Sequence, residues 1–251
     1  MGERIIGFMG AMPEEVDGII ALLDNPHHAT IGRRTYTSGL LNGYKTVVVF
    51  SRWGKVAASA TVSTLIHVYH ITELIFTGVA GAINPNLKIG DIVIAKRLIQ
   101  HDMDASPLMP RFEIPLLGVT WFEGGKHRID NASEAINKFL DKSSFNSCWD
   151  EETLAEFGIN QPTLHIGDVA SGDQFFAAEN QKNILLELLP DILCVEMEGA
   201  AVAQVCFEHD IPFTIIRIIS DTAGDDSHID FVKFIENISA KYSAGIISLL
   251  I

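Results

Sequence analysis

The sequence contains few cysteines, and their arrangement excludes two kinds of small scaffold. Only Cys148, Cys194 and Cys206 occur in 251 residues. Their number is odd, no two form a C-x-x-C pair, and none stands at a zinc-ligand spacing from a histidine. This pattern argues against a disulfide framework and against a structural zinc site. We therefore expect reduced thiols in a reducing compartment.

Long apolar runs are also missing. No window reaches the ~18 consecutive apolar residues that a membrane-spanning helix needs. The first residues, MGERIIGFMGAMPEEV, run into Pro13-Glu14-Glu15 without the long apolar region or the small-residue cleavage site of a signal peptide. This stretch predicts a first strand. The sequence therefore predicts a cytoplasmic protein that does not associate with a membrane.

Basic residues are scarce relative to acidic ones. The chain carries 18 lysines and arginines against 32 aspartates and glutamates, which gives a formal net charge of −14. Such an excess of negative charge repels phosphate backbones and anionic lipid headgroups. No nucleic-acid or membrane partner is expected. The remaining composition, 47% hydrophobic and 20% charged, is that of an ordinary globular protein.

Short apolar runs rich in valine and isoleucine alternate with longer segments of helical periodicity, a pattern typical of an α/β fold. The predicted strands are apolar on both faces, as in a sheet covered on two sides; they are Arg4–Gly10, Thr46–Ser51, Leu74–Val79, Asp91–Ala95, Thr163–Ala170, Ile192–Val195 and Phe213–Ile219. Tyr36–Gly39 and Thr46–Ser51 flank the pair Asn42-Gly43, which predicts a hairpin with a type I′ turn. A hairpin within this pattern predicts a mixed central sheet.

The predicted helices each open near a residue suited to a helix start; they are Glu14–Leu23, Lys55–Tyr69, Ala132–Lys142, Glu179–Leu188, Gly199–Glu208 and Asp230–Leu249. In the last helix, apolar residues from Phe231 to Leu249 recur at steps of three and four, which indicates a stripe buried in the core. The segment from His101 to Lys126 has no sustained periodicity, and such long segments are usually functional or interface loops. No repeat or linker is visible, so residues 1–251 are predicted to form a single domain.

Carboxylates follow the first predicted strand, in Gly10-Ala11-Met12-Pro13-Glu14-Glu15. An α/β sheet presents its ligand crevice at the carboxyl ends of its strands. A phosphate-binding loop there uses backbone amides and cations, whereas this loop carries two acids and so disfavours anions. We interpret Glu14 as a complement to the helix dipole. For Glu15, this interpretation and a functional role both stay open.

Small and aromatic residues end two further strands. In Thr77-Gly78-Val79-Ala80-Gly81, the backbone can pack against a flat ligand or against a neighbouring helix. Phe175 and Phe176 follow Ser171-Gly172-Asp173-Gln174, and aromatic rings beside backbone amides form a slot suited to a purine. Phenylalanine is more commonly a core residue, so one of the two is expected in the core.

Acids also end the last two predicted strands. Glu196 and Glu198 flank Met197, and a carboxylate at the edge of the core needs hydrogen-bond donors such as the vicinal hydroxyls of a ribose. For Glu198 a solvated helix N-terminus is the alternative, and Glu196 is interpreted as structural. Strand alternation places Arg217 and Asp221 on one face, so that a cation and an acid can line one cleft; a turn-forming role is the alternative for Asp221.

Another group of polar residues, His101, Asp102 and Asp104, superficially suggests a metal site. Its spacing fits no regular ligand geometry, so we interpret it as a polar loop and expect no metal.

Six segments together, in this order and spacing, resemble the nucleoside phosphorylase superfamily, and most closely its 5′-methylthioadenosine/S-adenosylhomocysteine nucleosidases. They are GAMPEEV from Gly10, WGKVAA from Trp53, TGVAGAINPNLKIGDIV from Thr77, SGDQF from Ser171, VEMEGAA from Val195 and ISDTAGDDSHIDF from Ile219. The resemblance implies a homodimeric α/β enzyme that needs no cofactor or metal. Its substrates would be adenine thioether nucleosides, with 5′-deoxyadenosine as a further candidate, and its products adenine and a thioribose.

The resemblance also implies residue roles. Asp221 matches the acid that protonates adenine at N7, and Glu15 matches the base that activates the attacking water, with Arg217 orienting it. Met197 and Glu198 match residues that bind the ribose hydroxyls, and the backbone of Phe176 faces the adenine edge. The other implied substrate-binding residues are Ala80, Gly81, Ser220 and Leu108. In the family, the Leu108 position reaches the neighbouring subunit's thioether pocket and is commonly aromatic; Val79 likewise replaces a common serine.

Two alternatives differ in chemistry. A phosphorylase of the same superfamily would attack with phosphate, but such relatives have arginine and serine where Glu15, Phe76 and Val79 stand here. A phosphate dianion facing Glu15 without compensating cations is disfavoured. The other alternative is a nucleoside-binding protein that has lost its chemistry, and the presence of both Glu15 and Asp221 argues against it.

Overall fold

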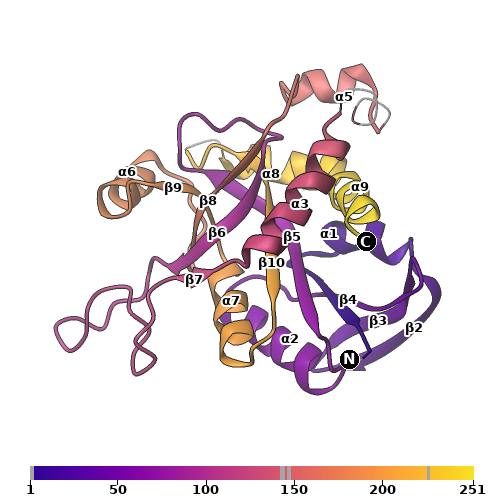
Figure 1. Ribbon diagram of the computed structural model, residues 1–251. Coiled ribbons are helices and arrows are strands. Elements are labelled where there is room, and N and C mark those ends of the chain that lie inside the picture. Colours follow the sequence, from indigo (N-terminus) through magenta and orange to yellow (C-terminus); the bar gives the residue numbers. More distant parts are fainter. Residues whose placement is uncertain (1–2, 142–144, 146–147, 225–226) are drawn as a thin grey trace.

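The strands of the computed structural model, which describes residues 3–141, 145, 148–224 and 227–251, form one mixed sheet within these ranges (Figure 1). The strands are β1 Ile5–Gly10, β2 Asp24–Ile31, β3 Arg34–Leu41, β4 Tyr44–Phe50, β5 Glu73–Ala82, β6 Ile92–Gln100, β7 Phe122–Glu123, β8 Leu164–Ser171, β9 Ile192–Glu196 and β10 Phe213–Asp221. Their order is β10-β6-β8-β9-β5-β1-β4-β3-β2. Because β10 also pairs with β5, the strands β5, β9, β8, β6 and β10 close into a ring.

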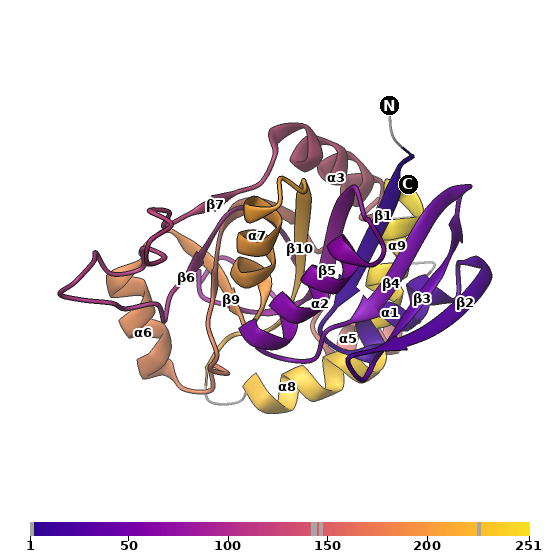
Figure 2. The same ribbon diagram turned by 90° about the horizontal axis from the view of Figure 1, so that it is seen from below.

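Helices cover this sheet on both sides (Figures 1 and 2). They are α1 Pro13–Ile20, α2 Lys55–His67, α3 Lys126–Phe139, α5 Glu151–Glu156, α6 Glu179–Leu188, α7 Gly199–Glu208, α8 Ser227–Phe234, the π-helix η1 Ile235–Ser239 and α9 Ala240–Leu250. One core cluster joins the sheet to α2 and α7, and two others join it to α1, α3 and α9. The predicted α/β fold, with a central mixed sheet flanked by helices, is confirmed. No helix in the described ranges is long and apolar enough to cross a membrane.

Most predicted elements lie close to their expected positions, but α3 begins six residues before the predicted Ala132 and β6 ends five residues after the predicted Ala95. The hairpin turn is confirmed, since Asn42 (φ 50°) and Gly43 (φ 84°) both take the positive φ of a type I′ turn. The eight-residue strand β2 and the short elements β7 and α5 were not predicted. The last predicted helix is not continuous, because the π-helix η1 separates α8 from α9.

Parallel pairing of β1 with β4 and β5, and of β5 with β10, brings four strand ends to one edge of the sheet. The segments that follow these strands therefore lie together. The end of β9 joins them, because Val195 pairs with Gly81 on β5. The irregular segment 101–121 projects away from the body beside α6 in both views (Figures 1 and 2).

Candidate active site

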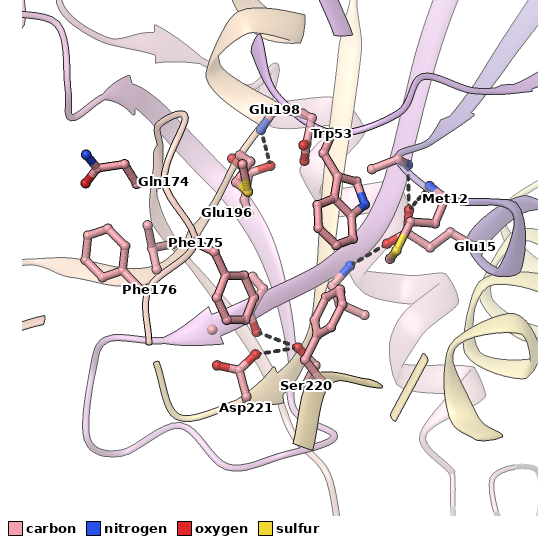
Figure 3. A pocket seen from close by; sticks show the side chains of 17 residues that line it. Met12, Glu15, Trp53, Gln174, Phe175, Phe176, Glu196, Glu198, Ser220 and Asp221 are labelled. Carbon is pink, nitrogen blue, oxygen red and sulfur yellow. Dashed lines mark hydrogen bonds between the residues drawn. The ribbon is translucent and has the colours of Figure 1, made fainter. Parts of the chain in front are cut away.

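A pocket that is partly open to solvent lies at this edge of the sheet (Figure 3). Eight of the ten predicted site residues line it: Glu15, Ala80, Gly81, Phe176, Met197, Glu198, Ser220 and Asp221. The other lining residues are Ala11, Met12, Trp53, Val79, Gln174, Phe175, Val195, Glu196 and Phe231. Segments from the first and the last quarter of the chain thus share one cavity. Arg217 and Leu108 lie outside its lining.

Glu15 is held in the pocket by backbone amides. Its Oε2 accepts hydrogen bonds from the N–H groups of Ala11 (2.5 Å) and Met12 (3.1 Å), and its Oε1 accepts one from Val79 (3.1 Å). The side chain is buried, and this burial raises its pKa, although the charge of Arg217 and the three amides oppose the shift. The Val79 position therefore contributes its backbone N–H to the carboxylate.

Asp221 enters from the end of β10, on the other side of the pocket in the view of Figure 3. Its Oδ2 accepts a hydrogen bond from the Ser220 hydroxyl (2.8 Å), and its Oδ1 accepts one from the Ala223 N–H (2.8 Å). A β-carbon at Gly81 would stand 2.9 Å from Oδ1, so the glycine makes room for this carboxylate. Asp225 and Asp226 of the same motif lie outside the described residues.

Arg217 forms a buried ion pair with Glu196. Its Nε and Nη2 donate to Glu196 Oε2 at 3.2 and 2.7 Å, while its guanidinium stacks on the Phe76 ring at 4.0 Å. The N–H groups of Glu198 and Gly199 and the Ser171 hydroxyl also donate to Glu196. This agrees with the structural role expected for Glu196. The described hydrogen bonds of Arg217 do not include Glu15, so its effect on Glu15 is one of charge.

Glu198 lies beside this ion pair with less compensation. Its Oε1 accepts a hydrogen bond from the Gly54 N–H (2.7 Å). Burial and the neighbouring Glu196 charge raise the pKa of Glu198 to about 8. With this raised pKa, the carboxyl group can hold its proton at neutral pH. It can then both donate hydrogen bonds to ligand hydroxyl groups and accept hydrogen bonds from them.

Aromatic side chains form the remaining wall. Phe176 is buried and Phe175 is partly exposed, and both line the pocket. Phe231 contacts Phe175 and Trp53 edge-to-face, with ring centroids 5.5 and 5.8 Å apart. Phe231, expected in the buried stripe of the last helix, packs against the core cluster and also lines the pocket. Trp53 was not predicted to line the pocket. The sequence feature that could have indicated it is its place at the start of the segment WGKVAA.

A polar tie connects three segments that build the pocket. Lys55 Nζ donates to Asp102 Oδ1 (2.6 Å), the Lys55 N–H donates to Asp173 Oδ1 (2.8 Å), and the Asp173 N–H donates to Asp102 Oδ2 (2.9 Å). Although burial alone raises it, these hydrogen bonds lower the pKa of Asp102 overall. Asp102, which we predicted to belong to a polar loop, thus joins the ends of β6 and β8 to the start of α2.

Four acidic side chains line the pocket, Glu15, Glu196, Glu198 and Asp221, of which Glu196 is paired with Arg217, and no basic side chain lines it among the described residues. Such a cavity disfavours an anion and stabilises positive charge. Two carboxyl groups on different sides of it suit acid–base cleavage of a glycosidic bond.

Comparison with known proteins shows the family of this chain. Residues 5–251 match the family model described as Phosphorylase superfamily, and the chain belongs to this family. A 5′-methylthioadenosine/S-adenosylhomocysteine nucleosidase from Mycobacterium bovis is 33% identical over 98% of this chain and 96% of the relative. The nucleosidase of that name from Neisseria meningitidis, solved with methylthio-immucillin-A, is 27% identical, with a TM-score of 0.86 and 98% of each chain covered. A futalosine hydrolase from Helicobacter pylori is 29% identical, with a TM-score of 0.81 and 98% and 97% covered.

Proposed function

We propose that this protein is a nucleosidase that hydrolyses the N-glycosidic bond of 5′-methylthioadenosine and S-adenosylhomocysteine, releasing adenine and a thioribose. Relatives with this name cover almost the whole chain at 33% identity. The pocket also combines apolar walls with a few polar groups, as is typical of small-molecule sites.

The two catalytic roles fall to Glu15 and Asp221. Adenine is a poor leaving group as an anion, so Asp221 protonates it at N7 while the ribose gains oxocarbenium character. Glu15 holds a water molecule on the opposite face of the sugar and takes its proton as the new bond to the anomeric carbon forms. The raised pKa of Glu15 favours this role, because a more basic carboxylate accepts a proton more readily.

Other residues that line the pocket bind the substrate. Glu198 and Met197 bind the ribose hydroxyls, and the Phe176 backbone meets the adenine edge. The small residues Ala80 and Gly81 leave room for the ligand, and Ser220 fixes Asp221 through its hydroxyl. Arg217 acts indirectly, by holding Glu196 and by its charge on Glu15.

The observation that carries hydrolysis over phosphorolysis is the acidic lining without a basic side chain among the described residues. Phosphate attack needs cations that compensate a dianion beside Glu15. The test is adenine release from 5′-methylthioadenosine, followed by absorbance with and without added phosphate. The proposal expects turnover that is independent of phosphate. No adenine release, or release only with phosphate, would reject it.

The proposal extends to assembly and location. We propose that residues 1–251 form a single catalytic domain that works as a homodimer in the cytoplasm, without a cofactor or metal. Leu108, on the projecting segment, is 89% exposed and lies outside its own pocket, as suits a residue that reaches a partner's thioether site. Light scattering of wild type and Leu108→Asp tests this: the variant should lose dimer and raise the KM for thioether substrates. A monomeric wild type would contradict it.

A further inference from the structure

Three arginines of this acidic chain lie together around the segment that precedes Trp53, a pocket-lining residue. Arg33 and Arg34 stand at the turn between β2 and β3, and Arg52 follows β4. None of the three pairs with a carboxylate among the described residues, although the chain carries 32 acidic residues. Arg33 and Arg52 are exposed. Their grouping therefore creates a local positive charge that no described ion pair neutralises.

Hydrogen bonds join these arginines to one another's segments and, through one backbone N–H, to the pocket. Arg34 donates from its guanidinium to the carbonyls of Gly32, Ser51 and Ala57, which holds the turn against the end of β4. Arg52 Nη2 donates to the Arg33 carbonyl (2.6 Å) and uses one of its five N–H donors in doing so. The Arg52 N–H donates to the carbonyl of Ala11, which lines the pocket, as does the next residue, Trp53.

The backbone at these positions is unfavourable for arginine. Arg52 has φ 76° and Arg33 has φ 60°, in the left-handed region where glycine is the residue that fits without strain. Non-glycine residues with a strained backbone often occur at ligand-binding sites, where the function of the side chain offsets the energetic cost of the conformation. Arg33 takes this conformation after Gly32 in the turn between β2 and β3, whereas Arg52 takes it directly before Trp53, a pocket-lining residue.

The direction of the substrate places its 5′ end near these arginines. In the proposed function, adenine lies toward Phe176 and Asp221, and the ribose hydroxyls lie at Glu198. Gly54 donates to Glu198, so the adjoining Trp53 stands beside the sugar. The apolar rim of Met12, Trp53 and Phe231 then remains for the 5′ thioether, and Trp53 is 53% exposed. A longer 5′ substituent would pass Trp53 and reach the residues behind it.

Resting on that function, we propose that Arg52, together with Arg33, forms a subsite for a carboxylate carried at the far end of the substrate's 5′ substituent. The ligand class is an adenine nucleoside with a carboxylate-terminated 5′ chain, of which S-adenosylhomocysteine is the test case. A guanidinium binds a carboxylate through paired N–H donors. The subsite gives such substrates an advantage that 5′-methylthioadenosine does not receive.

The experiment compares S-adenosylhomocysteine with its decarboxylated analogue, the 3-aminopropyl thioether of adenosine, which differs only by the carboxylate. The readouts are kcat/KM for adenine release and the dissociation constant by calorimetry. Arg52→Gly accepts the positive φ and removes the guanidinium, while Arg52→Lys keeps a positive charge. Lys138→Gln, on the exposed side of α3, removes one positive charge away from the pocket as a control.

Wild type should prefer S-adenosylhomocysteine over the analogue by roughly three- to tenfold, as expected for a partly exposed charge-assisted pair. Arg52→Gly should abolish this preference, Arg52→Lys should keep part of it, and Lys138→Gln should keep it whole. Raising the salt from about 50 mM to about 500 mM should weaken it in wild type. An unchanged preference in Arg52→Gly, or an equal loss in Lys138→Gln, overturns the subsite. Absence of any adenine release would instead reject the proposed function, while calorimetry still reads the subsite.

Discussion

Gly78 lies directly against the carboxylate of Glu15, so that a β-carbon on residue 78 would stand 2.8 Å from Glu15 Oε1. The same carboxylate is fixed by three backbone N–H groups. Its position therefore depends on the absence of a side chain at residue 78, on the neighbouring strand β5.

We predict that Gly78→Ala displaces the Glu15 carboxylate and lowers kcat by at least about tenfold, because small misplacements of a catalytic group are costly. The KM should change less, since Gly78 itself is not a lining residue. Steady-state kinetics checks this. Gly125→Ala is the control, because its φ is −66° and a β-carbon there meets nothing within 4 Å. Equal kinetics for the two variants would show that the Glu15 position is not critical.

We predict that Glu15→Gln and Asp221→Asn each reduce turnover by about 10²- to 10⁴-fold, the range for loss of a general acid or base. Both substitutions keep the shape of the side chain, so circular dichroism and thermal melting should show a folded protein. Adenine release under saturating substrate is the measurement. Near-native turnover in either variant would remove that residue from the mechanism.

The buried carboxyl of Glu198 should make stability depend on pH. Its pKa is raised to about 8 in the folded protein, chiefly by burial, whereas its ordinary value is 4.5. Between these values the folded state holds more protons than the unfolded state, so this group's contribution to the free energy of unfolding falls as the pH rises.

We therefore predict that Glu198→Gln flattens the decrease in thermal stability between about pH 5 and about pH 8. Melting curves across this window test the effect. Glu187→Gln, an exposed change on α6, is the control and should leave the pH profile as in wild type. The account fails here if Glu198→Gln and wild type lose stability in parallel.

The tie between Asp102 and Lys55 should affect substrate binding more than chemistry. We predict that Asp102→Ala raises the KM several-fold and lowers the free energy of unfolding by about 1 kcal/mol, because a partly exposed charge-assisted pair is lost. The kcat should change less. Asp104→Ala is the matched control, since Asp104 binds only within its own loop among the described contacts, to the Ser106 N–H and the Arg111 side chain. A KM that is equal in both variants would mean that the tie does not shape the pocket.

Local signals in the sequence account for most of the fold. The Asn42-Gly43 pair specifies its own turn, and apolar runs such as Phe213–Ile219 specify buried strands. The strand β2, with the sequence DNPHHATI, was missed because most of its residues are exposed and polar and it contains Pro26. The strand forms because it pairs with β3, although its own sequence does not favour a strand. The π-helix η1 was missed because its apolar residues continue the helical spacing on either side.

The candidate site shows a similar division. The acids at strand ends were visible because their strands were predicted, and parallel strands end at a common edge. The partner of Arg217 was not visible, since the choice of Glu196 over Glu15 depends on the register of β9 against the neighbouring strands. The pocket-lining role of Phe231 was hidden because a pattern of buried residues does not distinguish a core from a cavity wall.

The central claim is that water attacks a sugar held between Glu15 and Asp221. Its most direct test is cleavage of 5′-methylthioadenosine in ¹⁸O-labelled water containing phosphate, with mass spectrometry of the sugar product. The account predicts free methylthioribose with one ¹⁸O at the anomeric position, and greatly slowed formation in Glu15→Gln. A phosphorylated sugar, or an intact nucleoside after long incubation, would contradict it.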